Sequence, residues 1–89
     1  MDTNPLDGNA TAGKLSELFA FDVTVAVSTC ASCGDTRALA ELRAYVQAPG
    51  VVLRCASCSN VQVRLVRAPG RAWLDLRGVK VMEIPIAGA

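Results

Sequence analysis

Four cysteines form two pairs with identical spacing, and they are the residues of this chain best suited to chemistry. Cys30 and Cys33 enclose two residues, 21 residues follow, and Cys55 and Cys58 again enclose two. Each pair closes a tight loop that turns two sulfurs to one side. Four thiolates in a tetrahedral array suit Zn²⁺, with Zn–S bonds of about 2.3 Å. We therefore predict one structural zinc ion per chain, held by these four cysteines.

The residues that follow each pair support this prediction. Gly34 comes directly after Cys33, and Ser59 and Asn60 come after Cys58. Glycine adopts a left-handed backbone without steric cost, and asparagine tolerates it. Such turns direct backbone N–H groups at the cysteine sulfurs.

Three other uses of four cysteines stay open. A pair of structural disulfides needs an oxidising compartment, and no secretory signal is visible at the start of the chain. A rubredoxin-like iron site for electron transfer usually has proline inside the pair, whereas both pairs here enclose Ala-Ser. In a zinc site that senses or handles metal and oxidants, exposed thiolates are open to oxidation.

The sequence gives no support for catalysis. The chain has no histidine, so it lacks the commonest general base. Four cysteine ligands leave no open position on zinc for water or substrate. No serine has a visible activating base, and no glycine-rich phosphate loop is present. We therefore expect a protein that is not an enzyme.

The length of 89 residues fits one small domain with a marginal core, and metal is a common reinforcement in such domains. No apolar run approaches the roughly 18 residues of a membrane helix. Without a signal or a membrane segment, we expect a cytoplasmic protein with no membrane association.

Period-two alternation of apolar residues predicts the strands that position the cysteines. The first, Phe21–Val27, leads toward Cys30. Two Ala-Pro-Gly triplets, at 48–50 and 68–70, predict hairpin turns between the later strands. Those strands are Leu42–Gln47, Val51–Arg54, Val61–Leu65 and Trp73–Arg77.

The two ends of the chain have different patterns. Leu15, Leu18 and Phe19 recur at helical spacing and predict a helix over 10–19, with Asn4 and Pro5 as an earlier start. The tail is apolar from Val79 to Ile86 and predicts an edge strand, paired with the strand before Cys30, a second copy or a partner. We thus expect a metal-stabilised β domain, a zinc-ribbon antiparallel sheet with a short N-terminal helix. Its parts are a helical segment (1–20), the ribbon (21–78) and the tail (79–89).

One face of the predicted sheet combines cations with aromatic rings, as surfaces for single-stranded nucleic acid do. A solvated face whose arginine stems cover apolar residues is the alternative. Asp75 and Gln62 also fall on this face. The candidate binding residues are Arg43, Tyr45, Arg64, Trp73 and Arg77.

Charge shifts the choice of partner. The formal net charge is +1, and four thiolates on one Zn²⁺ lower it to about −1. We therefore expect a non-catalytic binding module that favours a protein partner and does not bind nucleic acid tightly. Nucleic acid stays open as a partner, as does a homodimer formed through the C-terminal tail.

Several motifs resemble a family of small actinobacterial proteins classed as a domain of unknown function. The resemblance runs from residue 6 to 78 and implies a zinc ribbon behind a short helix, with no assigned activity. Position 59 is serine where that pattern has glycine. The matching segments are Leu6–Ala10 with Ala12, Gly13 and Leu15, then Thr29–Gly34, Ala40–Tyr45, Ala48–Gly50, Val52–Cys55 and Leu74–Gly78.

Overall fold

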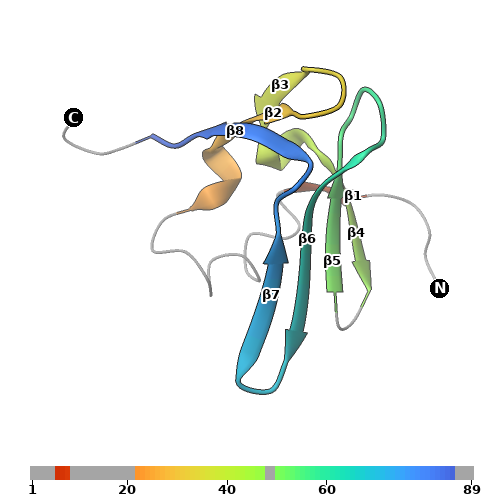
Figure 1. Ribbon diagram of the computed structural model, residues 1–89, viewed down its shortest axis with the longest axis vertical. Coiled ribbons are helices and arrows are strands. Elements are labelled where there is room, and N and C mark those ends of the chain that lie inside the picture. The colour runs from red at the N-terminus through yellow and green to blue at the C-terminus, as the bar shows by residue number, and fades with distance from the viewer. Residues whose placement is uncertain (1–5, 9–21, 48–49, 86–89) are drawn as a thin grey trace.

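Two antiparallel sheets form the part of the chain that the computed structural model describes, residues 6–8, 22–47 and 50–85 (Figure 1). The long sheet has the strand order β1-β4-β5-β6-β7, and the short sheet has the order β3-β2-β8. The short sheet lies at one end of the long sheet, opposite the tip of the β6–β7 hairpin (Figure 1). The elements are β1 (Leu6–Asp7), η2 (Val23–Val25), β2 (Val27–Cys30), β3 (Thr36–Ala38), η3 (Leu39–Glu41), β4 (Arg43–Gln47), β5 (Gly50–Arg54), β6 (Val61–Ala68), β7 (Arg71–Asp75) and β8 (Val79–Glu83).

The strands of the long sheet follow the predicted alternation closely. The β4–β5 and β6–β7 hairpins close at the two Ala-Pro-Gly triplets, with Gln47 opposite Gly50 and Ala68 opposite Arg71. Gly70 has a φ of +77°, which a turn with proline first and glycine second requires. The hairpin prediction is confirmed, because the turn residues and the alternation specify the same register.

The core lies on one face of the long sheet, between that face and the short sheet with its two 3₁₀ turns. Val46, Val79 and Met82 pack against it while partly exposed. Burial of these aliphatic side chains is the main favourable term in folding. The buried cluster consists of Val23, Ala26, Leu39, Leu42, Ala44, Val51, Leu53, Val63 and Leu65.

A β-bulge in β6 changes the expected side of two residues. The register between β5 and β6 shifts between Leu53 and Arg54, so Gln62 and Val63 are both buried although they are consecutive. The Gln62 Oε1 atom accepts a 2.7 Å hydrogen bond from the Ser28 hydroxyl of β2. The prediction that Gln62 lies on the binding face is therefore wrong. The bulge instead directs Gln62 to connect the two sheets.

The predicted strand Phe21–Val27 is also corrected. Its described part forms the 3₁₀ turn η2, and the strand begins only at Val27. The Asp22 carboxylate accepts hydrogen bonds from the backbone N–H and the hydroxyl of Thr24, at 3.1 and 2.5 Å. These side-chain hydrogen bonds give the backbone an alternative to pairing in a sheet. They favour a 3₁₀ turn here, although the alternation of apolar residues predicted a strand.

The N-terminal helix predicted over 10–19 lies outside the described residues. Its earlier start is wrong, because Leu6 and Asp7 form β1, paired with Ala44 and Arg43 of β4. Gly8 follows in close contact with η3, where a Cβ atom would lie 1.8 Å from the Leu39 carbonyl oxygen. Within the described residues, no helix is long and apolar enough to cross a membrane.

The C-terminal tail forms an intramolecular strand. β8 pairs with β2 from Val27 to Cys30, rather than with the upstream segment Phe21–Val27 that was expected to be the strand. Val79 and Met82 of β8 pack against the core. The sheet that carries the first cysteine pair therefore depends on the C-terminal segment of the chain.

Deleting residues 79–89 should lower the melting temperature and leave the molecular mass in solution that of one chain, because β8 completes the sheet that contains Cys30. Thermal unfolding and light scattering measure the two quantities. Deletion of 84–89 alone is the control, since it keeps all of β8. A dimer that becomes a stable monomer on removal of 79–89 would instead show that the tail joins two chains.

Candidate metal centre

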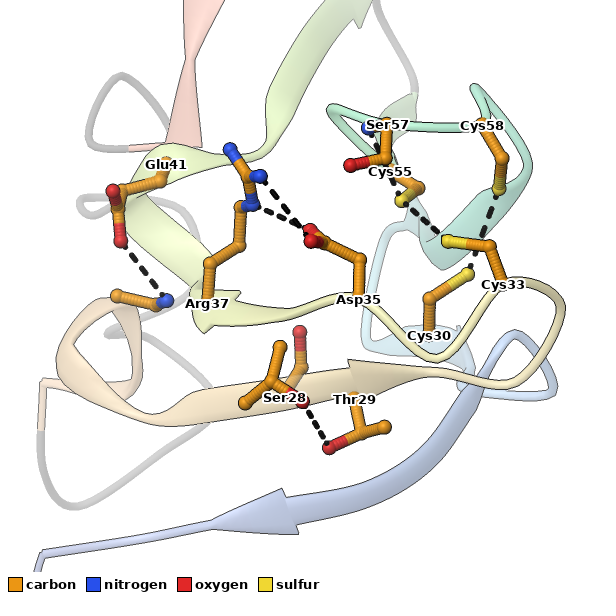
Figure 2. A network of polar contacts seen from close by, with 12 residues as sticks. Ser28, Thr29, Cys30, Cys33, Asp35, Arg37, Glu41, Cys55, Ser57 and Cys58 are labelled. Carbon is orange, nitrogen blue, oxygen red and sulfur yellow. Dashed lines mark hydrogen bonds and ion pairs between the residues drawn. The ribbon is translucent and has the colours of Figure 1, made fainter.

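The two cysteine pairs lie on turns that belong to different sheets. The first turn, residues 30–35, connects β2 to β3 in the short sheet, and the second, residues 55–60, connects β5 to β6 in the long sheet. Figure 2 shows Cys33 directed at Cys55 and Cys30 directed at Cys58 across the gap between the turns. We call these two turns the knuckles.

Both knuckles have the same backbone hydrogen bonds. In each, the first cysteine accepts a bond at its carbonyl from the residue four positions later. Its own N–H then donates to the carbonyl five positions later. Each knuckle is thus closed by two backbone hydrogen bonds. The bonds are Gly34 N to Cys30 O (3.0 Å), Cys30 N to Asp35 O (2.8 Å), Ser59 N to Cys55 O (3.0 Å) and Cys55 N to Asn60 O (2.8 Å).

The four sulfurs lie within 4.8 Å of one another, and all four cysteines are free thiols. Two of the separations cross between the knuckles, 3.7 Å from Cys30 to Cys58 and 3.6 Å from Cys33 to Cys55. A ZnS₄ tetrahedron with bonds of about 2.3 Å has edges of about 3.8 Å. The donor set and its spacing therefore fit a single tetrahedral metal ion.

Polar side chains connect the knuckles in a reciprocal pattern. The Asn60 amide of the second knuckle donates to the Ser32 hydroxyl of the first. In the opposite direction, Ser57 of the second knuckle hydrogen-bonds Asp35 of the first. The last residue of each knuckle, Asp35 or Asn60, thus contacts the serine inside the other knuckle. These contacts hold the two turns face to face.

Asp35 is also held by Arg37, whose Nε lies 2.5 Å from its carboxylate (Figure 2). The Arg37 guanidinium lowers the pKa of Asp35, and the Ser57 hydroxyl adds to that effect. The Asp35 carboxylate raises the pKa of Arg37, to which the charge of Cys55 contributes. A cation therefore lies beside the sulfur cluster, where four thiolates on a divalent metal would carry a net charge of −2.

The thiols differ strongly in acidity when no metal is bound. Burial raises the pKa of Cys55, but backbone N–H groups of Cys58 and Ser57 outweigh it and lower that pKa to about 6. The N–H of Ser57 lies 3.4 Å from the Cys55 sulfur. The N–H of Asp35 lowers the pKa of Cys33, but shielding from water and the other sulfurs raise it to about 12. Of these two cysteines, Cys55 is therefore the one that forms a thiolate more readily.

Exposure alternates within each pair. Cys30 and Cys55 are buried, whereas Cys33 and Cys58 are exposed.

Ala31 donates its N–H to the Gly78 carbonyl at 2.9 Å, which connects the first knuckle to the turn before β8. A Cβ atom on Gly78 would lie 1.8 Å from the Val61 carbonyl oxygen, so only glycine fits between this knuckle and β6.

The candidate binding residues gather on the face of the long sheet that points away from the core. Arg43 and Tyr45 of β4 share it with Arg64 of β6 and Trp73 of β7, as their register shows. Arg77 follows β7 and lies beside them, because its guanidinium contacts Asp75 at 2.6 Å. We call this surface the open face.

The sequence-based prediction of the binding residues did not include Arg54, which lies on the open face opposite Arg43. Its guanidinium donates to the Ser59 carbonyl of the second knuckle at 2.9 Å and lies 5.7 Å from the centre of the Tyr45 ring. Counting residues outward from the first Ala-Pro-Gly turn would have paired it with Arg43.

The chain belongs to DUF6510, a family of unknown function whose model matches residues 1–87. No curated protein and no solved structure matches the chain. Membership therefore places the cysteine cluster in a defined family, and the chemistry of the cluster has to be argued from its own residues.

Replacing Ser59 with glycine should stabilise the protein. Ser59 has a φ of +68°, at the position where the first knuckle has Gly34 with φ +79°. A left-handed conformation costs a non-glycine residue about 1–2 kcal/mol, part of which is offset by the greater entropy of unfolded glycine. We expect Ser59→Gly to gain about 0.5–1 kcal/mol in denaturant unfolding and Gly34→Ser, its matched counterpart, to lose about as much. Equal stability of all three proteins would contradict this account.

Proposed function

We propose that this protein is a non-catalytic zinc-ribbon module, in which one Zn²⁺ per chain fixes the fold and the open face binds a macromolecular partner. The observation that carries the proposal is the closed donor set. Four cysteine sulfurs surround one point within 4.8 Å of one another, and all four ligand positions of a tetrahedral metal are supplied by the chain. Such a site contributes to folding and leaves no position for a substrate.

The ligands narrow the choice of metal. Soft thiolates in tetrahedral array select zinc or iron among the common cellular metals. Backbone N–H groups of Ser57 and Cys58 are directed at the Cys55 sulfur, and that of Asp35 is directed at the Cys33 sulfur. The proposal is zinc, with rubredoxin-like iron and electron transfer as the alternative that metal analysis separates.

The purified protein should contain one zinc per chain and be colourless, and Cys33→Ser should lose both the metal and the fold. In metal-dependent folds, a binding free energy of about 10–16 kcal/mol is folding free energy. Ala31→Ser, which adds an oxygen at an exposed neighbouring position, is the matched control and should keep both. Elemental analysis, near-UV circular dichroism and thermal unfolding measure the effects.

Two results would overturn the zinc assignment. Iron with visible absorption would make the site an electron-transfer centre. A Cys33→Ser protein that keeps its near-UV spectrum and its melting temperature would show that the apolar core suffices without metal.

A redox role is the second candidate, and the exposure of Cys33 and Cys58 favours it. Oxidation could join sulfurs of opposite knuckles, since Cys30 lies 3.7 Å from Cys58 and Cys33 lies 3.6 Å from Cys55. Each disulfide forms as two thiols give two electrons and two protons to hydrogen peroxide, which is reduced to two molecules of water. The metal would then be released, because a disulfide no longer offers thiolate ligands.

Treating the zinc-loaded protein with hydrogen peroxide tests this second role. For a structural site we expect zinc to be retained at peroxide concentrations that oxidise a free exposed cysteine. A zinc-sensitive dye and mass spectrometry follow metal release and thiol loss. Rapid, reversible release with disulfides between the knuckles would make redox sensing the better description.

A further inference from the structure

We propose that the open face binds single-stranded nucleic acid, with arginines on its phosphates and a base stacked on Trp73. This inference rests on the proposed function, since it names the partner of the same module. It departs from the sequence-based preference for a protein partner, and the reason is where the fold places the charges.

The first argument is the geometry of the open face. Its residues form rows across the strands, and adjacent strands lie about 4.8 Å apart. The first row carries Arg43 and Arg54, and the second carries Tyr45, Val52, Arg64 and Asp75. The third carries Val66 beside Trp73, and the fourth carries Arg71. The rings and valines thus lie between the arginines of the first row and Arg71, with Arg64 among them.

The second argument is exposure. Trp73 is 53% exposed, and Arg43, Arg64 and Arg71 are exposed as well. An indole in this position covers little of the protein's own core, which lies on the opposite side of the sheet. Exposed aromatic rings beside cations form the stacking platforms that bind single strands without sequence preference.

The third argument is the distribution of acids among the described residues. Asp22, Asp35, Glu41 and Glu83 all lie outside the strands of the long sheet. Two acids share the open face. Asp75 is held by Arg77 through its side chain and backbone, and Asp7 lies at the β1 edge opposite Arg43. The near-neutral net charge therefore conceals a cationic surface.

The open face is also hollowed. A depression of about 410 Å³ is lined by Tyr45, Gly50, Val52 and Arg54. A smaller one of about 230 Å³ lies between Arg64, Asp75, Arg77 and the start of β6. Gly50 adds no side chain to this lining, so a base or sugar has room beside Arg54. A nucleic acid matches this face better than an acidic peptide does. Each nucleotide has a phosphate for an arginine and a flat base that can stack on Trp73 or Tyr45, whereas an acidic side chain has no such ring.

Arg54 connects this surface to the metal centre. Its guanidinium bonds the Ser59 carbonyl of the second knuckle and lies over Tyr45 on the open face. A knuckle closed by metal therefore holds this cation in place. Binding should accordingly require the metal-loaded protein.

Titration of the full-length, zinc-loaded protein with fluorescein-labelled U₁₂ and dT₁₂ tests the proposal, with fluorescence anisotropy as the readout. Zinc content and circular dichroism are measured on the same sample, so failure of the module and failure of the binding are distinguished. We expect the logarithm of the association constant to fall linearly with the logarithm of the salt concentration, at a slope of about −2 to −3. Three or four phosphate contacts that contribute about −0.7 each give this slope.

Variants separate stacking from charge. Trp73→Ala should weaken binding about 5–150-fold and leave the salt slope unchanged. Arg64→Gln should reduce the slope by about 0.7. The matched controls are Leu74→Ala and Arg67→Gln, which lie on the same strands but on the opposite face, and these should change neither quantity.

Three outcomes would overturn the proposal while leaving the zinc module intact. One is no binding of either oligonucleotide at low salt by folded, zinc-loaded protein. Another is equal binding by polyglutamate with no dependence on Trp73, which would make the face a site for acidic proteins. The third is an equal loss of affinity in the Arg67→Gln and Arg64→Gln variants, which would show that the oligonucleotide is attracted by charge and does not bind a defined face.

Discussion

The convergence of four sulfurs from two sheets is the constraint on which the rest of the molecule depends. One knuckle ends β2 of the short sheet and the other ends β5 of the long sheet, so a metal between them joins the two sheets at one point. The buried bond from Ser28 to Gln62 joins them at a second point. A small aliphatic core in so short a chain is marginal, so the buried polar contact and a metal in the cysteine cluster would both help to determine how the sheets sit together.

The two knuckles are near copies of each other, in sequence and in contacts. Each reads Cys-Ala-Ser-Cys, each has the same pair of backbone bonds, and each reaches the serine of the other. The symmetry breaks at Ser59, which adopts a left-handed backbone where its counterpart is Gly34. Arg54 bonds the carbonyl of Ser59 and so supports the more strained knuckle.

The same arginine connects structure to function. Burial of one face of the long sheet leaves the other face open, and β6 extends past β5 so that the tip of the β6–β7 hairpin projects beyond it (Figure 1). A metal that orders the second knuckle also orders Arg54, and with it the border of the open face. Stability and binding would then depend on the same ion.

The sequence by itself determined the two cysteine pairs, the two Ala-Pro-Gly hairpins and the alternation of the long sheet, because each depends on residues close together in the chain. It placed Arg43, Tyr45, Arg64, Trp73 and Arg77 on one surface for the same reason, since period two assigns a face within a strand. Only the tertiary structure decided the rest. A bulge turned Gln62 inward, the Asp22 cap replaced a strand with a 3₁₀ turn, and β8 paired with β2 far along the chain. The distribution of charge also depended on the tertiary structure. The net charge follows from the composition, but the positive charges gather on one face only because strands distant in the sequence lie side by side.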